Sequence, residues 1–173
     1  SIILLLIILI DFQSPFFVQK RSGILKKQIK IIKFQTMKFK KGEMRVTKLG
    51  KILRLSKIDE LPQLINILFN DMSIIGPRPL YIEFNDHYKE RHKLRLTIKP
   101  GLSGLAQIKV KDSTDWNKKF NYDVIYVKNS SFKLECYIII KTIILIFKSI
   151  FLKKSRAKES IQYKKNFYEN YCK

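Results

Sequence analysis

Two adjacent acids, Asp59 and Glu60, are the residues of this sequence most suited to chemistry. They follow a basic stretch that ends in Arg54 and Lys57, and they precede an apolar helical pattern. A carboxylate beside cations stays ionised, as a nucleophile or a magnesium ligand must. Magnesium is typically held by one or two carboxylates together with phosphates. Acids at a helix start also complement the helix dipole, so the pair by itself leaves a purely structural role open.

A second candidate is Arg78, which lies between Pro77 and Pro79 and follows Gly76. The two prolines predict an extended, rigid backbone at the arginine. A rigid guanidinium can bind a phosphate through two parallel hydrogen bonds. The alternative interpretation is a surface turn with an incidental arginine.

Four other residues are weaker candidates. Lys33, among apolar neighbours, could reach a phosphate or could simply belong to an amphipathic strand. The glycine-containing segment after Lys99 could turn backbone amides toward an anion, or it could be a plain loop. Asp123 and Tyr126 stand three apart on one predicted helix face. They could contact a ligand or could make a structural hydrogen bond.

The histidines and cysteines indicate no metal site. His87 and His92 are five apart in a polar stretch, match no metal-binding pattern and are expected to be solvated. Cys136 and Cys172 have neither zinc-like spacing nor a disulfide framework around them. Two isolated thiols fit a reducing cytoplasmic setting.

The elements that must position these residues follow from periodicity and turn residues. The first part of the chain predicts short strands, a turn and a basic amphipathic helix, at 16–19, 28–34, 40–42 and 45–57. The clearest helix covers 59–70, where Leu61, Leu64, Ile65 and Leu68 recur at helical spacing. Pro62 suits its first turn, whereas Ser56 would start it one turn earlier as part of a capping box.

The second part of the chain is predicted to be mostly helical. The pattern indicates a loop at 71–80, a polar helix at 81–96, two glycines and then a strand within 99–110, and helices at 114–129 and 132–152. Residues 153–173 are basic and are expected to form a frayed tail. The fold class predicted is α+β and mainly helical.

Composition favours a membrane surface as the setting. Thirty-five Lys and Arg stand against fourteen Asp and Glu, which gives a formal net charge of +21, yet 46% of the residues are hydrophobic. Such a chain attracts polyanions, and long Ile/Leu runs favour an anionic membrane over nucleic acid. No helix-turn-helix, RNP-like or zinc pattern supports a nucleic-acid-binding module.

Two apolar segments support the expectation of a membrane surface. Residues 1–10 are uninterrupted apolar but shorter than the roughly 20 residues that a spanning helix needs. They predict the end of a longer membrane segment or a buried strand. In the helix at 132–152, Lys141 and Lys148 are seven apart and share one face. Such a helix lies in an interface more readily than it crosses one.

The order of these motifs resembles the bacterial sugar transferase family, the monotopic phosphoglycosyl transferases that start glycan assembly on undecaprenyl phosphate. The matching segments follow the family order: FVQKRSG (17–23), KFQTM (33–37), RVTKLG (45–50), IDELPQLIN (58–66), DMSIIGPRP (71–79), KPGLSGLAQ (99–107), DVIY (123–126) and the closing helix with Lys141 and Thr142.

The resemblance implies a mechanism and a set of site residues. Asp59 would attack the β-phosphorus of a UDP-sugar, release UMP and hold the phosphosugar until undecaprenyl phosphate attacks it. Asp59 and Glu60 would be catalytic and would bind Mg²⁺. The substrate-binding residues would be Lys33, Arg54, Arg78, Lys99, Asp123 and Tyr126.

The resemblance also implies an organisation and a location. Residues 1–10 would be the second half of a re-entrant membrane helix, 11–152 the compact catalytic domain with interfacial amphipathic helices, and 153–173 a basic tail. The protein would act on the cytoplasmic face of the bacterial inner membrane, beside anionic lipids, with a homodimer as a further expectation. The sequence does not indicate which sugar is moved.

Two departures keep an alternative open. The family usually has Arg where this chain has Gln35, and the usual acid of the last helix is replaced near Cys136. An inactive, membrane-associated paralogue that acts as a partner protein is therefore the alternative interpretation.

Overall fold

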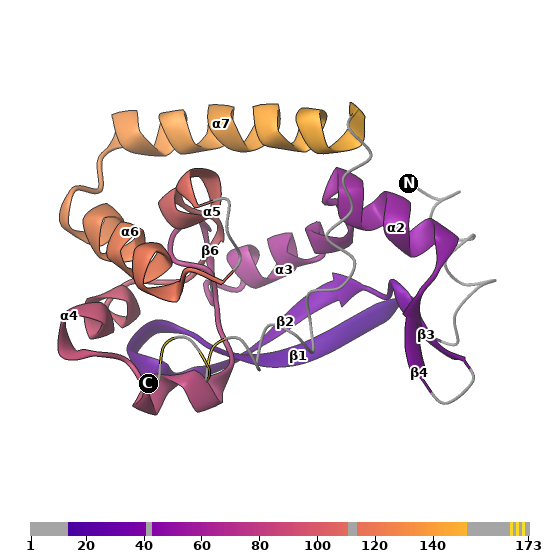
Figure 1. Cartoon of the computed structure of the whole chain (residues 1–173), viewed down its shortest axis with the longest axis horizontal. Coiled ribbons are helices and arrows are strands. Elements are labelled where there is room, and N and C mark those ends of the chain that lie inside the picture. Colours follow the sequence, from indigo (N-terminus) through magenta and orange to yellow (C-terminus); the bar gives the residue numbers. More distant parts are fainter. Residues whose placement is uncertain are drawn as a thin grey trace.

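Two antiparallel hairpins form the first part of the fold (Figure 1). The structure is a computed structural model that describes residues 14–40, 43–110 and 114–151, together with Phe167, Glu169 and Tyr171. Strands β1 (Phe16–Ser22) and β2 (Gln28–Phe34) pair around the short helix η1 (Ile24–Lys26). Strands β3 (Met37–Lys40) and β4 (Glu43–Val46) form the second pair.

The strand predicted at 28–34 is confirmed as β2, and the one predicted at 16–19 is confirmed as the first part of β1. In β2 the alternating Ile29 and Ile31 are buried, as expected for a strand with one face on the core. The turn expected at 40–42 falls mostly on Lys41 and Gly42, which lie outside the described residues.

Helix α2 (Lys48–Ser56) begins later than the sequence predicts. The pattern indicates a helix from 45, but Arg45 and Val46 belong to β4. The hydroxyl of Thr47 accepts a hydrogen bond from the Gly50 amide at 2.9 Å and caps the helix start. Such a cap satisfies an amide that has no partner within the helix.

The helix predicted at 59–70 is divided into two elements. Asp59 and Glu60 lie in the single 3₁₀ turn η2 (Ile58–Glu60), and α3 (Gln63–Leu68) begins only after Pro62. Of the two starts that the sequence leaves open, the one at Pro62 agrees with α3, whereas the capping box at Ser56 does not form, because this hydroxyl donates to the Ile52 carbonyl of its own helix at 2.9 Å. Helix α2 ends instead at its C-cap residue Lys57, which adopts the left-handed conformation with φ 60°.

A parallel strand pair links two distant loops. Strand β5 (Ser73–Ile75) pairs with β6 (Gly101–Ser103), so the predicted loop at 71–80 contains a strand. The strand expected after the two glycines is wrong, because helix α5 (Leu105–Lys109) follows β6. The predicted polar helix at 81–96 is broken into η3 (Ile82–Asp86), α4 (Glu90–Lys93) and η4 (Leu94–Leu96).

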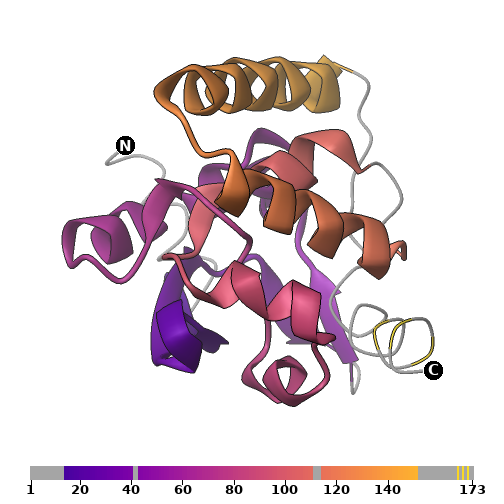
Figure 2. The same ribbon diagram turned by 90° about the vertical axis from the view of Figure 1, so that its left-hand side faces the viewer.

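Helices α6 (Trp116–Lys128) and α7 (Phe132–Phe151) confirm two predictions, although residue 152 lies outside the described part. Helix α7 lies along one side of the molecule and the β1–β2 hairpin along the other, with α3, α5 and α6 between them (Figures 1 and 2). Among the described residues, none of the helices combines the length and the apolar character that spanning a bilayer requires. The α+β, mainly helical fold class is confirmed.

An aromatic cluster forms the largest part of the core. It comprises Leu80, Phe84, Tyr88, Leu96, Trp116, Phe120, Phe167 and Tyr171. The expectation of a frayed tail is wrong at Phe167 and Tyr171, which are buried there. The expectation that His92 is solvated is also wrong, because its Nδ1 lies 2.7 Å from the buried Tyr171 hydroxyl. The other histidine, His87, is exposed as expected.

Candidate active site

The acid pair sits in a buried position on the short turn η2. Asp59 is 9% exposed and Glu60 is 8% exposed. The neighbouring helix α3 is fixed to β2 by Asn66, whose side-chain nitrogen donates to the Lys30 carbonyl at 2.7 Å. Its oxygen accepts from the Ile32 amide at 3.1 Å. These bonds hold β2 beside the acid pair.

One carboxylate oxygen of Glu60 contacts three cationic side chains. Its Oε1 lies 3.0 Å from Lys33 Nζ and 3.8 Å from Lys57 Nζ. Nη2 of Arg78 donates to the same oxygen at 3.0 Å. Burial alone would raise the pKa of Glu60, but the three cations together hold this pKa well below its ordinary value. Glu60 is therefore ionised at neutral pH.

Asp59 has a different environment. Its Oδ1 is buried and has no hydrogen-bond partner among the described residues. Burial and then the neighbouring Glu60 charge raise the pKa of Asp59, against smaller opposing effects of Lys33 and Lys57. Ionisation of Asp59 at neutral pH stays a prediction, but the pKa values of the two acids shift in opposite directions. The reason is that the cations contact the neighbouring carboxylate.

The cations around the pair differ in exposure. Lys33 is mostly buried, and desolvation lowers its pKa, with Glu60 opposing the change. Arg78 has a side chain that is 38% exposed, so it is open to a ligand on one side. Arg54 donates from Nε to the Thr36 hydroxyl at 2.9 Å. It is close enough to lower the pKa of Asp59.

The structure brings Lys33, Arg54 and Arg78 to the acid pair, but it gives the other predicted binding residues different partners. The ammonium group of Lys99 donates to the side-chain oxygen of Asn70. Asp123 accepts from Arg95 Nε at 3.0 Å, and both groups are buried.

Tyr126 likewise has an internal partner. Its hydroxyl donates to Glu135 Oε1 at 3.0 Å, and burial raises its pKa above the ordinary value. Roles for Lys99, Asp123 and Tyr126 in ligand binding remain predictions.

Sequence reasoning missed two buried polar residues near these groups. Gln63 lies one turn after Asp59, is buried, and its Nε2 has no partner among the described residues. Its four-residue spacing from Asp59 was a signal that could have identified it. Arg95 is buried within the stretch that the sequence predicts as a polar helix, so only its tertiary contacts reveal it.

The residues at the two departures from the family pattern have ordinary surroundings. Gln35 donates from Nε2 to the Met37 carbonyl at 3.0 Å. Cys136 is a half-buried free thiol on α7. Neither residue contributes a charge at its position.

The acid pair offers oxygen ligands for a cation. The contacts of Glu60 with cations use Oε1, and the buried Oδ1 of Asp59 has no hydrogen-bond partner within the described ranges. Magnesium prefers such oxygens and is often held by one or two carboxylates plus phosphates. The donor set therefore fits Mg²⁺ shared with a substrate, but no group of three or more His, Cys, Asp or Glu side chains occurs in the described residues.

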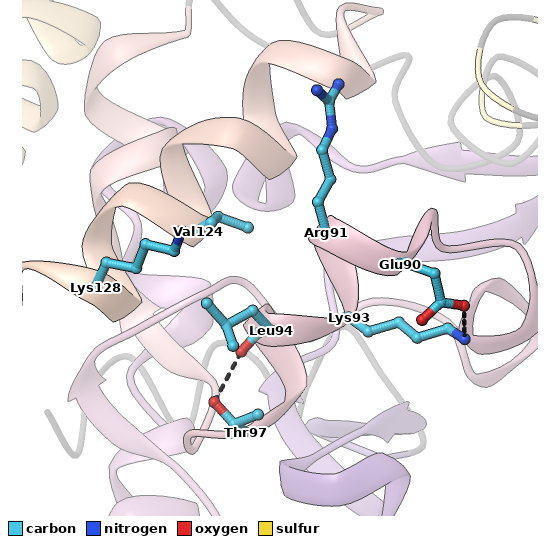
Figure 3. Close-up of a pocket in the computed structure, with 7 residues that line it drawn as sticks. All are labelled: Glu90, Arg91, Lys93, Leu94, Thr97, Val124 and Lys128. Carbon is cyan, nitrogen blue, oxygen red and sulfur yellow. Dashed lines mark hydrogen bonds and ion pairs between the residues drawn. The ribbon is translucent and has the colours of Figure 1, made fainter.

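A separate hollow of about 430 Å³ opens between α4, η4 and α6 (Figure 3). It is lined by Glu90, Arg91, Lys93, Leu94, Thr97, Val124 and Lys128. None of the predicted site residues lines it, and Lys93 is paired with Glu90. The hollow is therefore distinct from the carboxylate pair.

A carboxylate pair among cations, in a small α+β domain, forms a site suited to binding phosphorylated ligands. The family model described as bacterial sugar transferase matches residues 1–149. This chain belongs to the bacterial sugar transferase family.

Known relatives agree with this assignment. The chain is 43% identical over 139 residues to the uncharacterized sugar transferase EpsL of Bacillus subtilis, covering 75% of this chain and 69% of that protein. It is 39% identical over 145 residues to the UDP-glucose:undecaprenyl-phosphate glucose-1-phosphate transferase of Klebsiella pneumoniae, covering 73% of this chain and 31% of that protein.

A third relative handles a different sugar. The chain is 38% identical over 155 residues to the UDP-N-acetylgalactosamine-undecaprenyl-phosphate N-acetylgalactosaminephosphotransferase of Aeromonas hydrophila. The match covers 79% of this chain and 37% of that protein. The chain therefore spans about a third of the length of these last two relatives.

Proposed function

We propose that this protein transfers a sugar 1-phosphate from a UDP-sugar to undecaprenyl phosphate through an intermediate on Asp59. The reaction would be the first membrane step in assembling a bacterial glycan such as a capsule, exopolysaccharide, O-antigen or glycoprotein glycan. The observation that supports it most is the buried Asp59 oxygen without a partner, beside a Glu60 that collects three cations. Family membership and the names of the relatives support the substrate classes.

The reaction divides into two displacements at one phosphorus. In the first, a carboxylate oxygen of Asp59 bonds to the β-phosphorus, the bond from that phosphorus to the bridging oxygen breaks, and UMP leaves. In the second, a phosphate oxygen of undecaprenyl phosphate attacks the same phosphorus, the bond to Asp59 breaks, and the carboxylate is restored. A covalent intermediate of this kind replaces one difficult step by two easier ones.

The cations around Glu60 would stabilise the charge that develops during both displacements. Arg78 reaches Glu60 from a partly exposed position, so a diphosphate could share its guanidinium. Lys33 would contribute a fixed charge from the buried side. Fixed cations in a water-poor site are usually a large part of catalysis.

Asp59 and Glu60 would also hold Mg²⁺ through carboxylate oxygens other than the Glu60 Oε1 that the cations contact. When bound, the ion would neutralise diphosphate charge and favour departure of UMP. Glu60 would remain ionised throughout, because its cationic partners keep its pKa low.

The exposed apolar side chains support action at a membrane surface. On α7 they are Phe132, Ile139, Ile140, Ile143, Ile144, Leu145, Phe147, Ile150 and Phe151, and around α3 they are Leu61, Leu64, Ile65, Leu68 and Phe69. An amphipathic helix with basic residues lies in the interface plane of a bilayer. The net charge of +21 would strengthen attachment to the anionic cytoplasmic leaflet of the inner membrane.

The direct test is UMP release by the purified full-length protein with Mg²⁺, across a panel of UDP-sugars. We expect Asp59→Asn to reduce release by at least about 10⁴-fold, because the amide is not a nucleophile. In the absence of acceptor, mass spectrometry should find a phosphosugar on the peptide that contains Asp59. Activity that survives in the Asn variant would remove Asp59 from the nucleophile role.

A further inference from the structure

Arg95 and Asp123 form a buried ion pair that is separate from the acid pair Asp59 and Glu60. Through Arg95, this ion pair is joined to two other segments of the chain. Nε of Arg95 donates to Asp123 Oδ2 at 3.0 Å, and the two side chains are 3% and 5% exposed. Nη1 of Arg95 donates to the Tyr88 hydroxyl at 2.9 Å. Nη2 donates to the backbone carbonyl of Arg78 at 2.7 Å. Each of the three guanidinium nitrogens therefore contacts a different segment.

The third contact falls on the segment that carries a cation to the active site. The carbonyl of Pro77 accepts from the Gly101 amide at 3.0 Å, and the next carbonyl, that of Arg78, accepts from Arg95. Two successive carbonyls are thus held by donors from different elements. Because prolines flank Arg78, fixing these carbonyls fixes the direction in which its side chain leaves the backbone.

We propose that Arg95 and Asp123 are positioning residues for the phosphosugar transfer: Arg95 holds the Arg78 backbone so that the Arg78 guanidinium faces the acid pair, and Asp123 orients Arg95. This inference rests on the proposed function. It gives Asp123 a role through Arg95 and Arg78, without contact to the substrate. Lysine cannot replace Arg95, because a single ammonium group cannot reproduce three donors in a planar fork.

The energetics agree with a positioning role. A buried ion pair adds little stability compared with apolar side chains of the same size. Its particular contribution is orientation, since each partner fixes the direction of the other. Misplacement of a substrate-binding group by about 1 Å can reduce a rate by about 100-fold.

The test is a double-mutant cycle on the full chain in lipid nanodiscs, with Arg95→Lys, Arg78→Ala and the double variant. We expect Arg95→Lys to lower kcat/KM for UMP release by about 10- to 100-fold. In the Arg78→Ala background the same change should cause little further loss, because the group that Arg95 positions is then missing. Losses that multiply would assign Arg95 a general structural role and overturn the proposal. The matched control is Arg45→Lys, in an exposed ion pair with Glu43.

A second readout does not depend on activity. NMR relaxation of the Arg78 Nε–H group, assigned by its loss in Arg78→Ala, should show a more mobile guanidinium in Arg95→Lys. An unchanged Arg78 signal would overturn the positioning role, even if the variant were inactive. If the parent protein released no UMP from any UDP-sugar, the proposed function would fail, and this signal alone would decide the positioning role.

Milder variants cover the case in which Arg95→Lys does not fold. Asp123→Asn keeps the size and an acceptor oxygen but removes the charge that orients Arg95. Tyr88→Phe removes one of the three contacts of Arg95 and leaves the ion pair. We expect both to loosen Arg78 and to lower kcat/KM, with the smaller effect in Tyr88→Phe. A tightly held Arg78 in folded Asp123→Asn protein would contradict the proposal.

Discussion

At the scale of single residues, the two adjacent acids have opposite electrostatic environments. The negative charge of Glu60 is balanced by ion pairs with Lys33, Arg78 and Lys57. Asp59, by contrast, is desolvated and lies next to the Glu60 charge. Environments that separate the pKa values of two neighbouring carboxyls usually give them different roles. Under the proposed function, Glu60 would keep the cations in place and Asp59 would bond to the incoming phosphorus.

This difference predicts that Asp59→Asn stabilises the metal-free protein at neutral pH. The folded state raises the pKa of Asp59 above its ordinary 3.8, so ionisation is less favourable in the folded than in the unfolded protein. The resulting loss of folding stability is absent below pH 3.8. It develops as the pH rises from 3.8 through the higher pKa of Asp59 in the folded state. We expect the Asn variant to gain about 1 kcal/mol, or about 2–4 °C in Tm, at pH 8. The gain should shrink toward pH 4 in thermal melts with a chelator.

Glu60→Gln is the matched comparison and should have the opposite sign. It removes the charge that pairs with the buried Lys33 and with Arg78. Removing one partner of a buried ion pair costs about 3–5 kcal/mol. The folded state lowers the pKa of Glu60, so this stabilisation is present above 4.5 and declines as the pH falls below it. Equal stability of the two variants at pH 8 would contradict these environments.

At the scale of elements, periodicity predicted the regular segments and failed where tertiary contacts set the conformation. The strand at 28–34 and the helices at 114–129 and 132–152 have clear apolar patterns, and each is present. The 59–70 pattern also looks continuous, but the chain forms a single 3₁₀ turn after the left-handed Lys57, and α3 begins only after Pro62. Glu60 in that turn is held by ion pairs with residues distant in the sequence, such as Lys33, which a periodic pattern cannot indicate.

The pairing of β5 with β6 shows the same limit. Its strands are three residues each and join segments about 28 residues apart, so neither has a pattern of its own. Gly101 makes the pairing close, because a Cβ there would lie 2.0 Å from the Gly76 amide nitrogen. The sequence identified the acid pair, Lys33 and Arg78, but the link from Arg78 to Arg95 depends on a backbone carbonyl and has no sequence signal.

Packing of α2 predicts an effect of Gly50→Ala that contradicts helix propensity. Alanine in a helix interior is favoured over glycine by about 1 kcal/mol. A Cβ at Gly50, however, would lie 2.1 Å from the backbone oxygen of Thr36, so α2 would have to move away. We expect a net loss of about 1–3 kcal/mol in urea unfolding, together with a weakened contact between Arg54 and Thr36. Lys51→Ala on the exposed side of the same helix is the control, and a stabilised Gly50→Ala protein would contradict this close packing.

At the scale of the whole molecule, the site depends on segments that are distant in the sequence. Lys33 comes from β2, the acid pair from η2, and Arg78 from the segment after β5. The buried aromatic cluster includes Leu80, two residues after Arg78, and also Phe167, which stacks on Phe84 with 3.6 Å between ring centroids. Residues outside the family match at 1–149 therefore contribute to the core that supports the site.

Charge and exposed apolar surface together predict two separable contributions to membrane binding. The net charge of +21 should draw the protein to vesicles that contain anionic lipid at low salt. Higher salt should weaken this contribution, since the Debye length falls from about 10 Å at 0.1 M to about 3 Å at 1 M. The vesicle binding that remains at high salt should depend on the exposed apolar side chains of α7.

Replacing Ile140, Ile143 and Phe147 together by serine tests that dependence. These side chains are exposed and lie at i, i+3 and i+7 on α7. Burial of about 1 kcal/mol each predicts a loss of about 100-fold in partitioning measured by vesicle sedimentation in high salt. The variant keeps residues 1–10, so the comparison isolates α7, and Phe39→Ser on the exposed β3 strand is the control. Unchanged high-salt binding of the triple variant would mean that α7 does not contact the bilayer, because the other membrane-binding features are the same in both proteins.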